Sequence, residues 1–465
     1  MVSSMSPPPP SSARPRAEGS PERRRVAVGC GVGAVIETYD FIGFGTAAAL
    51  YFGDVFFPGS DPTAALLLSF ATLGIGFAAR PLGGIIAGHL GDRIGRKPVL
   101  VGSLLIMGVA TVLIGCLPTY QAVGLWAPIL LVIVRVVQGL AFGAEWGGAI
   151  LMTFEHAPWR KRGLYTGITQ AGFPVGLLLS NLAFLVSTRT LDGSWAWRVP
   201  FLLSAVLIVV GILIRLKIDE SPEFEELKES GQVARNPLLE VVRDDWRNVV
   251  RAFCLRSAET AGYAVSITFV LSYLDDDAAP DVSGTVSLTA LVTAAALGIV
   301  ATVAWGALSD RIGRRPVYLL GSAVTLLWGV PMFLLIGTES AVLVLVTFVV
   351  SYCVCQNALA GVQGAWFSEL FATKTRTAGT SLAYQLSAVV SGFTPMIATA
   401  LYSAIGWTGP AVLFSLYGLL GLLATLLTRE TWHARDQASS ATIPHTDRSR
   451  RTLAPSPSSA THKEH

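Results

Sequence analysis

Long apolar runs alternate with short polar segments along most of this chain. Each run is roughly 20 to 25 residues long, which is enough for a helix to cross the hydrocarbon core of a membrane. Backbone groups in lipid must be satisfied within the protein, and runs of this length favour helices. We therefore expect twelve membrane-spanning helices, at about residues 26–50, 64–90, 98–117, 124–153, 163–187, 196–217, 249–273, 285–308, 316–336, 341–366, 378–403 and 408–428.

The composition supports this interpretation. Apolar residues make up 52% of the 465 residues and charged residues only 14%, whereas a soluble domain carries about 25% charged residues. The two ends differ from the rest: residues 1–25 are rich in Pro, Ser and Arg, and residues 431–465 are polar. Segments of this kind cannot bury a core, so we expect two disordered cytoplasmic tails. The five cysteines lie in predicted spans, which argues against a disulfide framework.

Two short patterns occur twice at a nearly constant offset. One reads GHLGDRIGRKP at Gly88–Pro98 and GALSDRIGRRP at Gly306–Pro316, each time between two apolar runs. The other is a Glu and an Arg with six residues between them, at Glu155 and Arg162 and again at Glu369 and Arg376. Repeats in register indicate two homologous halves. The predicted units are an N-terminal six-helix bundle at 26–217, a cytoplasmic connector at 218–248 and a C-terminal six-helix bundle at 249–430.

The cations gather on alternate loops. If the N-terminus is inside, the Arg and Lys clusters at 93–97, 160–162, 311–315 and 374–376 all lie inside as well. The opposite loops hold only two cations, Arg189 and Arg198. The positive-inside rule then predicts a multi-pass protein of the plasma membrane with both termini in the cytoplasm.

Two carboxylates interrupt the first span, in the sequence ETYDF at Glu37–Phe41. Glu37 lies about eleven residues into the helix, near the bilayer centre, and Asp40 lies one turn further on the same face. An ionised group there costs about 2.5–3.5 kcal/mol, so both side chains must face a cavity or a partner. A buried pair that only fixes helix packing is one interpretation. We favour proton binding, because two neighbouring carboxylates in a partly dry site cannot both ionise easily.

The fourth span carries a second group of charges. Arg135 lies near the middle of the membrane and shares a helix face with Gln138, and Glu145 follows in the cytoplasmic half. Arg135 is a natural partner for Asp40 or Glu37 and equally a natural clamp for a substrate carboxylate. Glu37, Asp40, Arg135 and Glu145 are therefore our candidates for proton coupling.

Further polar residues of the spans predict a central cavity. In the seventh span Arg256 can pair with Glu259, and Tyr263 can face the same space. A helix–helix hydrogen bond is the alternative role for each polar residue of this kind. The complete set of candidates for the substrate cavity is Arg135, Gln138, Gln170, Arg256, Glu259, Tyr263, Gln363, Trp366 and Tyr384.

Twelve spans in two halves, with the motif G-x-x-x-D-R-x-G-R-[KR]-P after the second and eighth, resemble the major facilitator superfamily over residues 26–430. The segments ETYDF, GFAARPLGG, RVVQGLAFGAEWGG, WRVPFLLS and ESPEF resemble the metabolite:proton symporter family, whose members include shikimate, ketoglutarate, citrate and proline/betaine carriers. One departure is Ala144, where family members often have Gly. The resemblance implies that spans one, four, seven and ten line the cavity and that ion pairs at the cytoplasmic surface act as gates. The gating residues that it implies are Asp92, Arg93, Arg96, Glu155, Arg162, Asp310, Arg311, Arg314, Glu369 and Arg376.

These features predict a secondary active transporter and not an enzyme. We expect proton-coupled uptake of a small carboxylate-bearing or zwitterionic metabolite by alternating access, with no cofactor other than the coupling proton. The expected partners are that metabolite, the proton and the lipid bilayer, with no nucleic acid, and the expected state is a monomer. Three alternatives stay open. A drug or metabolite:proton antiporter has the same fold but would need a more apolar pocket, a sugar facilitator would have few central carboxylates, and a membrane sensor would bind without transporting.

Overall fold

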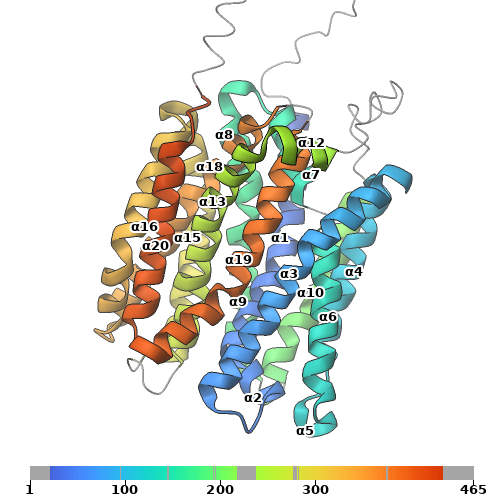
Figure 1. Ribbon diagram of the computed structural model, residues 1–465. Helices are drawn as coiled ribbons and strands as arrows, with labels where there is room; N and C mark the ends of the chain where they lie inside the picture. The colour runs from blue at the N-terminus through green and yellow to red at the C-terminus, as the bar shows by residue number, and fades with distance from the viewer. Residues whose placement is uncertain are drawn as a thin grey trace, which may run out of the picture.

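The computed structural model describes residues 21–94, 96–143, 146–191, 193, 195–216, 237–275, 280, 282–372 and 375–432. All regular structure within those residues is helical, and the long helices stand side by side in one bundle (Figure 1). Many Leu, Val and Ile side chains on the outside of the bundle are exposed, such as Val300, Leu327 and Leu427. A continuous apolar exterior of this kind suits a lipid surface.

The first half of the chain forms six spans, two of which consist of two consecutive helices. Short helices α2 (Phe52–Phe56), α5 (Tyr120–Val123) and η1 (Trp159–Lys161) lie between them. The spans are α1 (Pro21–Leu50), α3 (Pro62–Ile94), α4 (Arg96–Cys116), α6 (Trp126–Phe142) with α7 (Trp146–His156), α8 (Arg162–Gln170) with α9 (Gly172–Thr190), and α10 (Trp195–Leu216).

The second half also forms six spans, and two of them contain a π-helical segment. A short helix, α12 (Pro237–Asp244), precedes them. The spans are α13 (Trp246–Tyr263) with π-helical η2 (Ala264–Phe269) and α14 (Val270–Tyr273); α15 (Gly284–Ile312); α16 (Arg314–Ile336); α17 (Ala341–Val349) with π-helical η3 (Val350–Gln356) and α18 (Asn357–Leu370); α19 (Arg376–Ile405); and α20 (Thr408–Leu427).

The expected class of fold, an all-helical membrane protein, is confirmed. Eight helices of the described residues are long and apolar enough to cross a membrane, and Val101–Cys116 and Trp126–Phe142 are shorter apolar helices. The two remaining predicted spans, α1 and α13, are those that carry the buried charges Glu37, Asp40, Arg256 and Glu259. The boundaries differ in detail, since α1 already begins at Pro21 and α12 lies within the predicted connector.

The first and last described helices fix the two ends of the bundle. α1 begins and α20 finishes at the same end, which we call the terminal end; α2 and α5 lie at the opposite end, which we call the far end (Figure 1). An aromatic cluster packs the first half near the far end, with Phe52 and Phe56 each 5.9 Å from Trp197 between ring centroids. These rings are fully buried and meet edge to face, which is a favoured geometry for aromatic pairs.

Glycines let α3 and α6 approach unusually closely. A Cβ atom added at Gly139 would overlap the backbone oxygen of Gly76, and one added at Gly143 would overlap that of Arg80. No other residue type fits such a contact without moving a helix. The close approach places two arginines, Arg80 on α3 and Arg135 on α6, beside each other and next to the acidic face of α1.

Candidate functional site

A cavity lies between the two halves of the bundle, about midway along the spans. Residues of α1, α3, α6, α8 and α9 line it from the first half, and residues of α13, η2, η3, α18 and α19 line it from the second. It offers about 90 Å³ to the centres of water-sized molecules, and a single water needs about 10–15 Å³. The cavity therefore has room for several waters or a small solute. Its polar lining includes Arg80, Gln170, Arg256, Glu259, Tyr263 and Tyr384.

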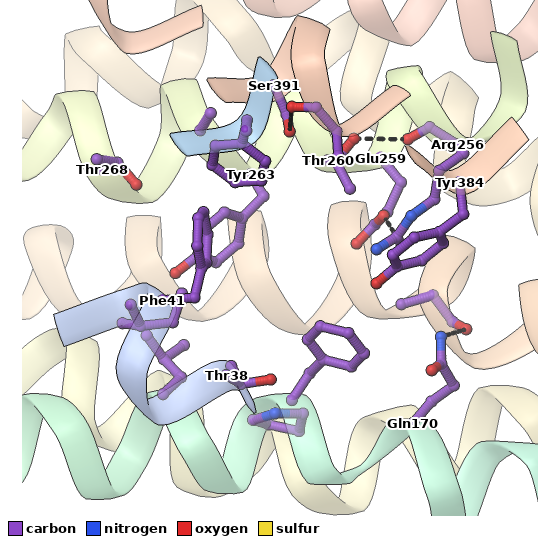
Figure 2. A pocket seen from close by; sticks show the side chains of 18 of the residues that line it. Thr38, Phe41, Gln170, Arg256, Glu259, Thr260, Tyr263, Thr268, Tyr384 and Ser391 are labelled. Carbon is purple, nitrogen blue, oxygen red and sulfur yellow. Dashed lines mark hydrogen bonds and ion pairs between the residues drawn. The ribbon is translucent and has the colours of Figure 1, made fainter. Parts of the chain in front are cut away.

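Arg256 is the centre of a buried polar cluster on one side of this cavity. It forms an ion pair with Glu259, one turn further along α13, and its Nη1 donates a hydrogen bond of 2.7 Å to Gln363. Figure 2 shows the guanidinium beside the ring of Tyr384, whose centroid lies 4.2 Å away. The predicted pairing of Arg256 with Glu259 is thus confirmed. Sequence reasoning missed Tyr318, whose hydroxyl accepts a hydrogen bond of 3.0 Å from Gln363.

Two predicted residues complete the cavity wall from other directions. Gln170, at the end of α8, donates a hydrogen bond of 3.3 Å from Nε2 to the carbonyl of Ala360 and so joins the two halves beside the cavity. Tyr263 lies next to Tyr352, with 6.1 Å between their ring centroids. In Figure 2, Thr38 and Phe41 of α1 face the same space from the first half.

A smaller cavity lies within the first half, between α1, α3, α4 and α6. It offers about 20 Å³, which is enough for one water. Asp40 accepts a hydrogen bond of 2.8 Å from Thr111, and Gln138 donates one of 2.7 Å to the same hydroxyl. Arg135 donates to Gln138 at 2.5 Å. Arg135 is therefore linked to Asp40 through Gln138 and Thr111.

Arg80 is a functional candidate that sequence reasoning missed. Its Nη2 lies 4.0 Å from Oε1 of Glu37, an ion pair that joins α3 to α1. Its Nε donates a hydrogen bond of 3.1 Å to Gln385 of the other half, and its guanidinium lies 3.5 Å from the ring centroid of Phe142. The signal was present in the sequence GFAARPLGG, where an arginine interrupts an otherwise apolar run.

Four predicted cavity residues do not line the large cavity. Arg135 and Gln138 line the small cavity instead, and Gln363 and Trp366 line neither. Trp366 is fully buried in the core near the terminal end, where its indole N–H donates to the carbonyl of Arg429 at 3.3 Å. Gln363 is not part of the cavity lining, and it holds Arg256 by accepting a hydrogen bond from its Nη1. Asn357 and Ala360 are the α18 residues that face the cavity. Glu145 lies outside the described residues.

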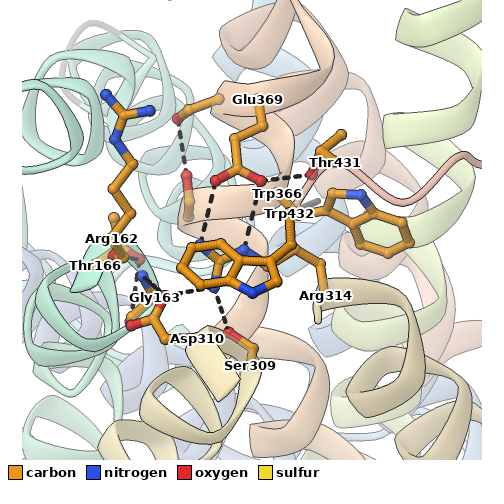
Figure 3. Close-up of polar contacts among 12 residues, drawn as sticks. Arg162, Gly163, Thr166, Ser309, Asp310, Arg314, Trp366, Glu369, Thr431 and Trp432 are labelled. Atoms are coloured by element: carbon orange, nitrogen blue, oxygen red, sulfur yellow. Dashed lines mark hydrogen bonds and ion pairs between the residues drawn. The ribbon is translucent and has the colours of Figure 1, made fainter. Parts of the chain in front are cut away.

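The terminal end is closed by a buried charge network between the halves (Figure 3). Asp310, on α15, accepts hydrogen bonds of 2.8 and 2.7 Å from the backbone N–H groups of Gly163 and Leu164, at the start of α8. A helix N-terminus favours such an anion. Arg314, which is fully buried, donates to Asp310 at 2.7 Å and to Glu369 at 3.2 Å.

The remaining predicted gating residues are arranged differently from our expectation. Glu155 pairs with Arg376 at 3.7 Å, so this pair joins the two halves and does not follow the repeat within each half. Arg162 lies over the ring of Phe154, 4.0 Å from its centroid. Arg311 is exposed and takes part in no ion pair among the described residues, and its gating role stays a prediction. The side chains of Asp92, Arg93 and Arg96 lie outside the described part of the structure.

The segment after α20 crosses this network. The carboxylate of Glu430 accepts hydrogen bonds of 3.2 and 2.9 Å from the backbone N–H groups of Arg314 and Arg315. The Thr431 hydroxyl donates to Glu369 at 2.5 Å. The ring of Trp432 lies 5.1 Å from that of Trp159 in the first half. We call Arg429–Trp432 the C-terminal strap; it holds both halves at the closed end.

Comparison with known proteins decides the family. The profile of the Major Facilitator Superfamily matches residues 31–354 and 260–457. The chain belongs to the major facilitator superfamily. A further member, the shikimate transporter of Escherichia coli K12, is 37% identical over 420 residues, which cover 88% of this chain and 95% of that protein. The proline/betaine transporter of the same strain is 30% identical over 425 residues, covering 88% and 84%.

Solved structures agree on the fold of this major facilitator superfamily protein. The proton:xylose symporter XylE bound to 6-bromo-6-deoxy-D-glucose superimposes with a TM-score of 0.68 at 16% identity, covering 88% of this chain and 96% of that one. The resemblance to metabolite:proton symporters that the motifs indicated is confirmed by the transporters above. The protein is a multi-pass membrane transporter and not an enzyme.

Proposed function

We propose that this protein is a proton-coupled symporter that takes up a small carboxylate-bearing or zwitterionic metabolite by alternating access. The observation that carries the proposal is the central cavity, where buried Arg80 of the first half meets buried Arg256 and Glu259 of the second half. Buried ionisable groups in a membrane protein mark pathways for ions and charged solutes. The transporters of shikimate and of proline/betaine that the chain resembles carry compounds of this kind, as their names state.

We assign the terminal end to the cytoplasm and the protein to the plasma membrane as a monomer. The clusters of Arg and Lys on the terminal-end loops support this orientation through the positive-inside rule. In this orientation the charge network around Asp310 and Arg314 shuts the cavity from the cytoplasm. Opening the cavity inward then requires the hydrogen bonds of Asp310 to α8 and the Glu155–Arg376 pair to break.

The coupling proton binds, in this proposal, to the acidic face of α1. Glu37 and Asp40 are both nearly fully buried beside Arg80 and Arg135. Protonation of a carboxylate there removes a charge from the cluster and weakens its hold on the neighbouring guanidinium. Glu145 stays a predicted member of this group from the sequence alone.

The substrate occupies the large cavity. Arg256 and Glu259 place opposite charges within one turn of α13, while Gln170 and Tyr384 offer neutral hydrogen-bonding groups. Such a lining suits a solute with a carboxylate and further polar groups. Gln138 and Gln363 act indirectly by fixing Arg135 and Arg256.

The membrane potential supplies enough energy for accumulation. Moving one net charge through 100 mV provides about 2.3 kcal/mol. Because about 1.4 kcal/mol corresponds to a factor of ten, one charge supports roughly forty-fold accumulation before any pH gradient contributes.

The test is uptake into proteoliposomes with an imposed inward proton gradient. Labelled shikimate, 2-oxoglutarate, citrate, proline and glycine betaine are compared with and without a protonophore. Accumulation of one compound that the protonophore abolishes is the expected result. If no compound accumulates in folded protein, the symporter proposal is wrong for these substrate classes.

A second candidate, a drug or metabolite:proton antiporter, is favoured by one observation. The cavity wall also contains aromatic rings, among them Phe41, Phe77, Phe142 and Phe173. The direction of proton movement separates the two functions. A symporter acidifies the vesicle lumen when substrate is added outside, whereas an antiporter makes it more alkaline, and a pH dye trapped in the vesicles reports the difference.

A further inference from the structure

Arg80 connects the two cavities. It is the charged side chain that lines both the large cavity and the small one, in the part of the chain that the structure describes. Its exposed fraction is only 5%. On one side it faces Glu37, and on the other it faces the space that we assign to the substrate. A ligand group in the large cavity and the carboxylate of Glu37 can therefore reach the same guanidinium.

The surroundings fix the guanidinium but leave one edge without a close acceptor. Phe142 stacks against its plane at 3.5 Å, and Gln385 accepts a hydrogen bond from Nε at 3.1 Å. Nη2 has no hydrogen-bond partner among the residues that the structure describes, since its distance of 4.0 Å from Glu37 exceeds hydrogen-bonding range. A buried charged donor without an acceptor is costly unless a ligand completes it. The guanidinium of Arg80 is thus held in a fixed position, and an anion can approach it in the plane of the guanidinium group.

The other two buried arginines are less suited to this role. Arg256 already forms an ion pair with Glu259 and donates to Gln363 through the same nitrogen, Nη1, so a carboxylate would have to displace contacts that the protein already makes. Arg135 donates to Gln138 and lines only the small cavity of the two. Arg80 is the remaining candidate for direct contact with a carboxylate in the large cavity.

The charged and titratable groups around Glu37 determine how protonation acts. Asp40 lies one turn along α1, Arg80 faces Glu37 from α3, and Arg135 lies across the small cavity on α6. Tyr384 approaches from α19. Asp40 is held by the hydroxyl of Thr111 on α4. Of the two carboxylates, Glu37 is therefore the one whose charge acts on Arg80 most directly.

We propose that Arg80 binds the carboxylate of the transported metabolite, and that ionised Glu37 competes with that carboxylate for the same guanidinium until a proton neutralises it. The inference rests on the proposed proton-coupled function and names the residue that links the proton to the substrate. Because protonated Glu37 releases Arg80, affinity for a carboxylate increases as the pH falls. One linked proton changes the affinity by at most about tenfold per pH unit.

The experiment measures binding to the purified full-length chain in lipid nanodiscs between pH 5.5 and 8.5. The probes are shikimate and glycine betaine, each compared with its methyl ester, which has the same skeleton without the negative charge. The variants are R80Q, R80K and E37Q. R198Q is the matched control, because Arg198 is also an arginine stacked on an aromatic ring in a span, but it bonds to Gly115 away from both cavities. A melting curve for each variant shows that it is folded, and R80K keeps the charge if R80Q does not fold.

The expected results are specific. At least one carboxylate probe binds the wild type more tightly at low pH and more tightly than its ester. R80Q weakens that binding by about 10- to 100-fold, as expected for a lost charge-assisted contact, and R80K weakens it less. E37Q binds as tightly at high pH as the wild type does at low pH, and R198Q behaves like the wild type.

Different outcomes separate the two proposals. If folded R80Q or R80K binds the carboxylate probe as tightly as the wild type, the role of Arg80 is refuted while proton-coupled uptake stands. If E37Q keeps the full pH dependence, competition by Glu37 is refuted. If proteoliposomes accumulate none of the compounds and no probe binds the wild type, the proposed substrate class fails and the inference fails with it.

Discussion

Replacing Gly163 by alanine tests the closed terminal end most directly. Gly163, at the start of α8, packs against α15 of the other half. A Cβ atom there would lie 2.6 Å from Nη1 of Arg314 and 2.6 Å from Oγ of Ser309, and it would overlap the carbonyl oxygen of Gly306. Backbone cannot move aside as a side chain can. The methyl group therefore fits only if α8 and α15 separate, which means that the terminal end opens.

The size of the effect follows from this contact. Forcing an extra methyl group into a packed interface costs about 1–3 kcal/mol. Since the clash exists only in the closed state, the cost moves the equilibrium between conformations by roughly 5- to 140-fold toward the state open at the terminal end. Separation of the helices also removes the two hydrogen bonds that Asp310 accepts from α8. The folded protein should remain intact, because the open state avoids the clash.

Pulsed electron paramagnetic resonance distances provide the assay. In a cysteine-free background, spin labels at the exposed residues Arg160 and Arg311 report the terminal end, and labels at Gln121 and Ser403 report the far end. In the Gly163→Ala variant, we expect the first distance to lengthen and the second to shorten.

Two matched glycines serve as controls for this prediction. A Cβ atom at Gly102 meets no atom within 4 Å, so Gly102→Ala should leave both distances unchanged. At Gly167, also on α8, the nearest atoms lie 3.4 to 3.6 Å away, which is ordinary contact, so Gly167→Ala should not open the interface. The reasoning is refuted if Gly163→Ala leaves the terminal-end distance unchanged, or if Gly102→Ala shifts it equally.

Three further variants test other parts of the molecule. Asp40→Asn should abolish uphill accumulation in proteoliposomes while at least some exchange of labelled for unlabelled substrate continues; unchanged proton-driven accumulation would contradict its role. Trp432→Ala removes the ring that packs on Trp159, and an aromatic pair contributes about 0.5–1.5 kcal/mol. The open terminal-end population should therefore rise by about 2- to 10-fold, measured with the same spin labels, and an equal effect of Trp126→Ala, an exposed position, would argue against the strap. Tyr318→Phe leaves the Leu255 carbonyl and the Gln363 amide each without this buried partner; it should cost about 1–3 kcal/mol, seen as a lower melting temperature in lipid, and an unchanged melting temperature would show that these bonds contribute little.

The class of fold and many of the buried charged residues could be predicted from the sequence. Insertion into lipid imposes a length and a composition on every span. Charges that interrupt apolar runs are equally visible, and Glu37, Asp40 and Arg256 are all buried in the structure. Their partners were harder to predict. Arg80 of α3 pairs with Glu37 of α1, a contact that depends on how these two helices pack in the folded bundle. Sequence spacing carries no information on contacts between distant segments.

Repeats predicted the two halves but misled about pairing at the terminal end. Glu155 and Arg162 share a spacing with Glu369 and Arg376, yet Glu155 contacts Arg376 of the opposite half. The positions match because the halves resemble each other, whereas the contacts depend on how the halves meet. Gln363 and Trp366 were candidates for the cavity, yet Gln363 hydrogen-bonds to Arg256 and Tyr318 between helices, which is the alternative role that the sequence left open for such residues.

Both π-helical segments lie in the second half beside the cavity, and none of the described helices of the first half is π-helical. Ala264 and Thr268 of η2 and Tyr352 of η3 line the cavity. π-helical turns within α-helices are frequent at functional sites. We therefore expect substitutions around η2 and η3 to alter which metabolite fits, while the acidic face of α1 continues to bind the proton. In such a molecule, the residues that select the substrate and the residues that bind the proton can change independently during evolution, so a new substrate does not require a new proton site.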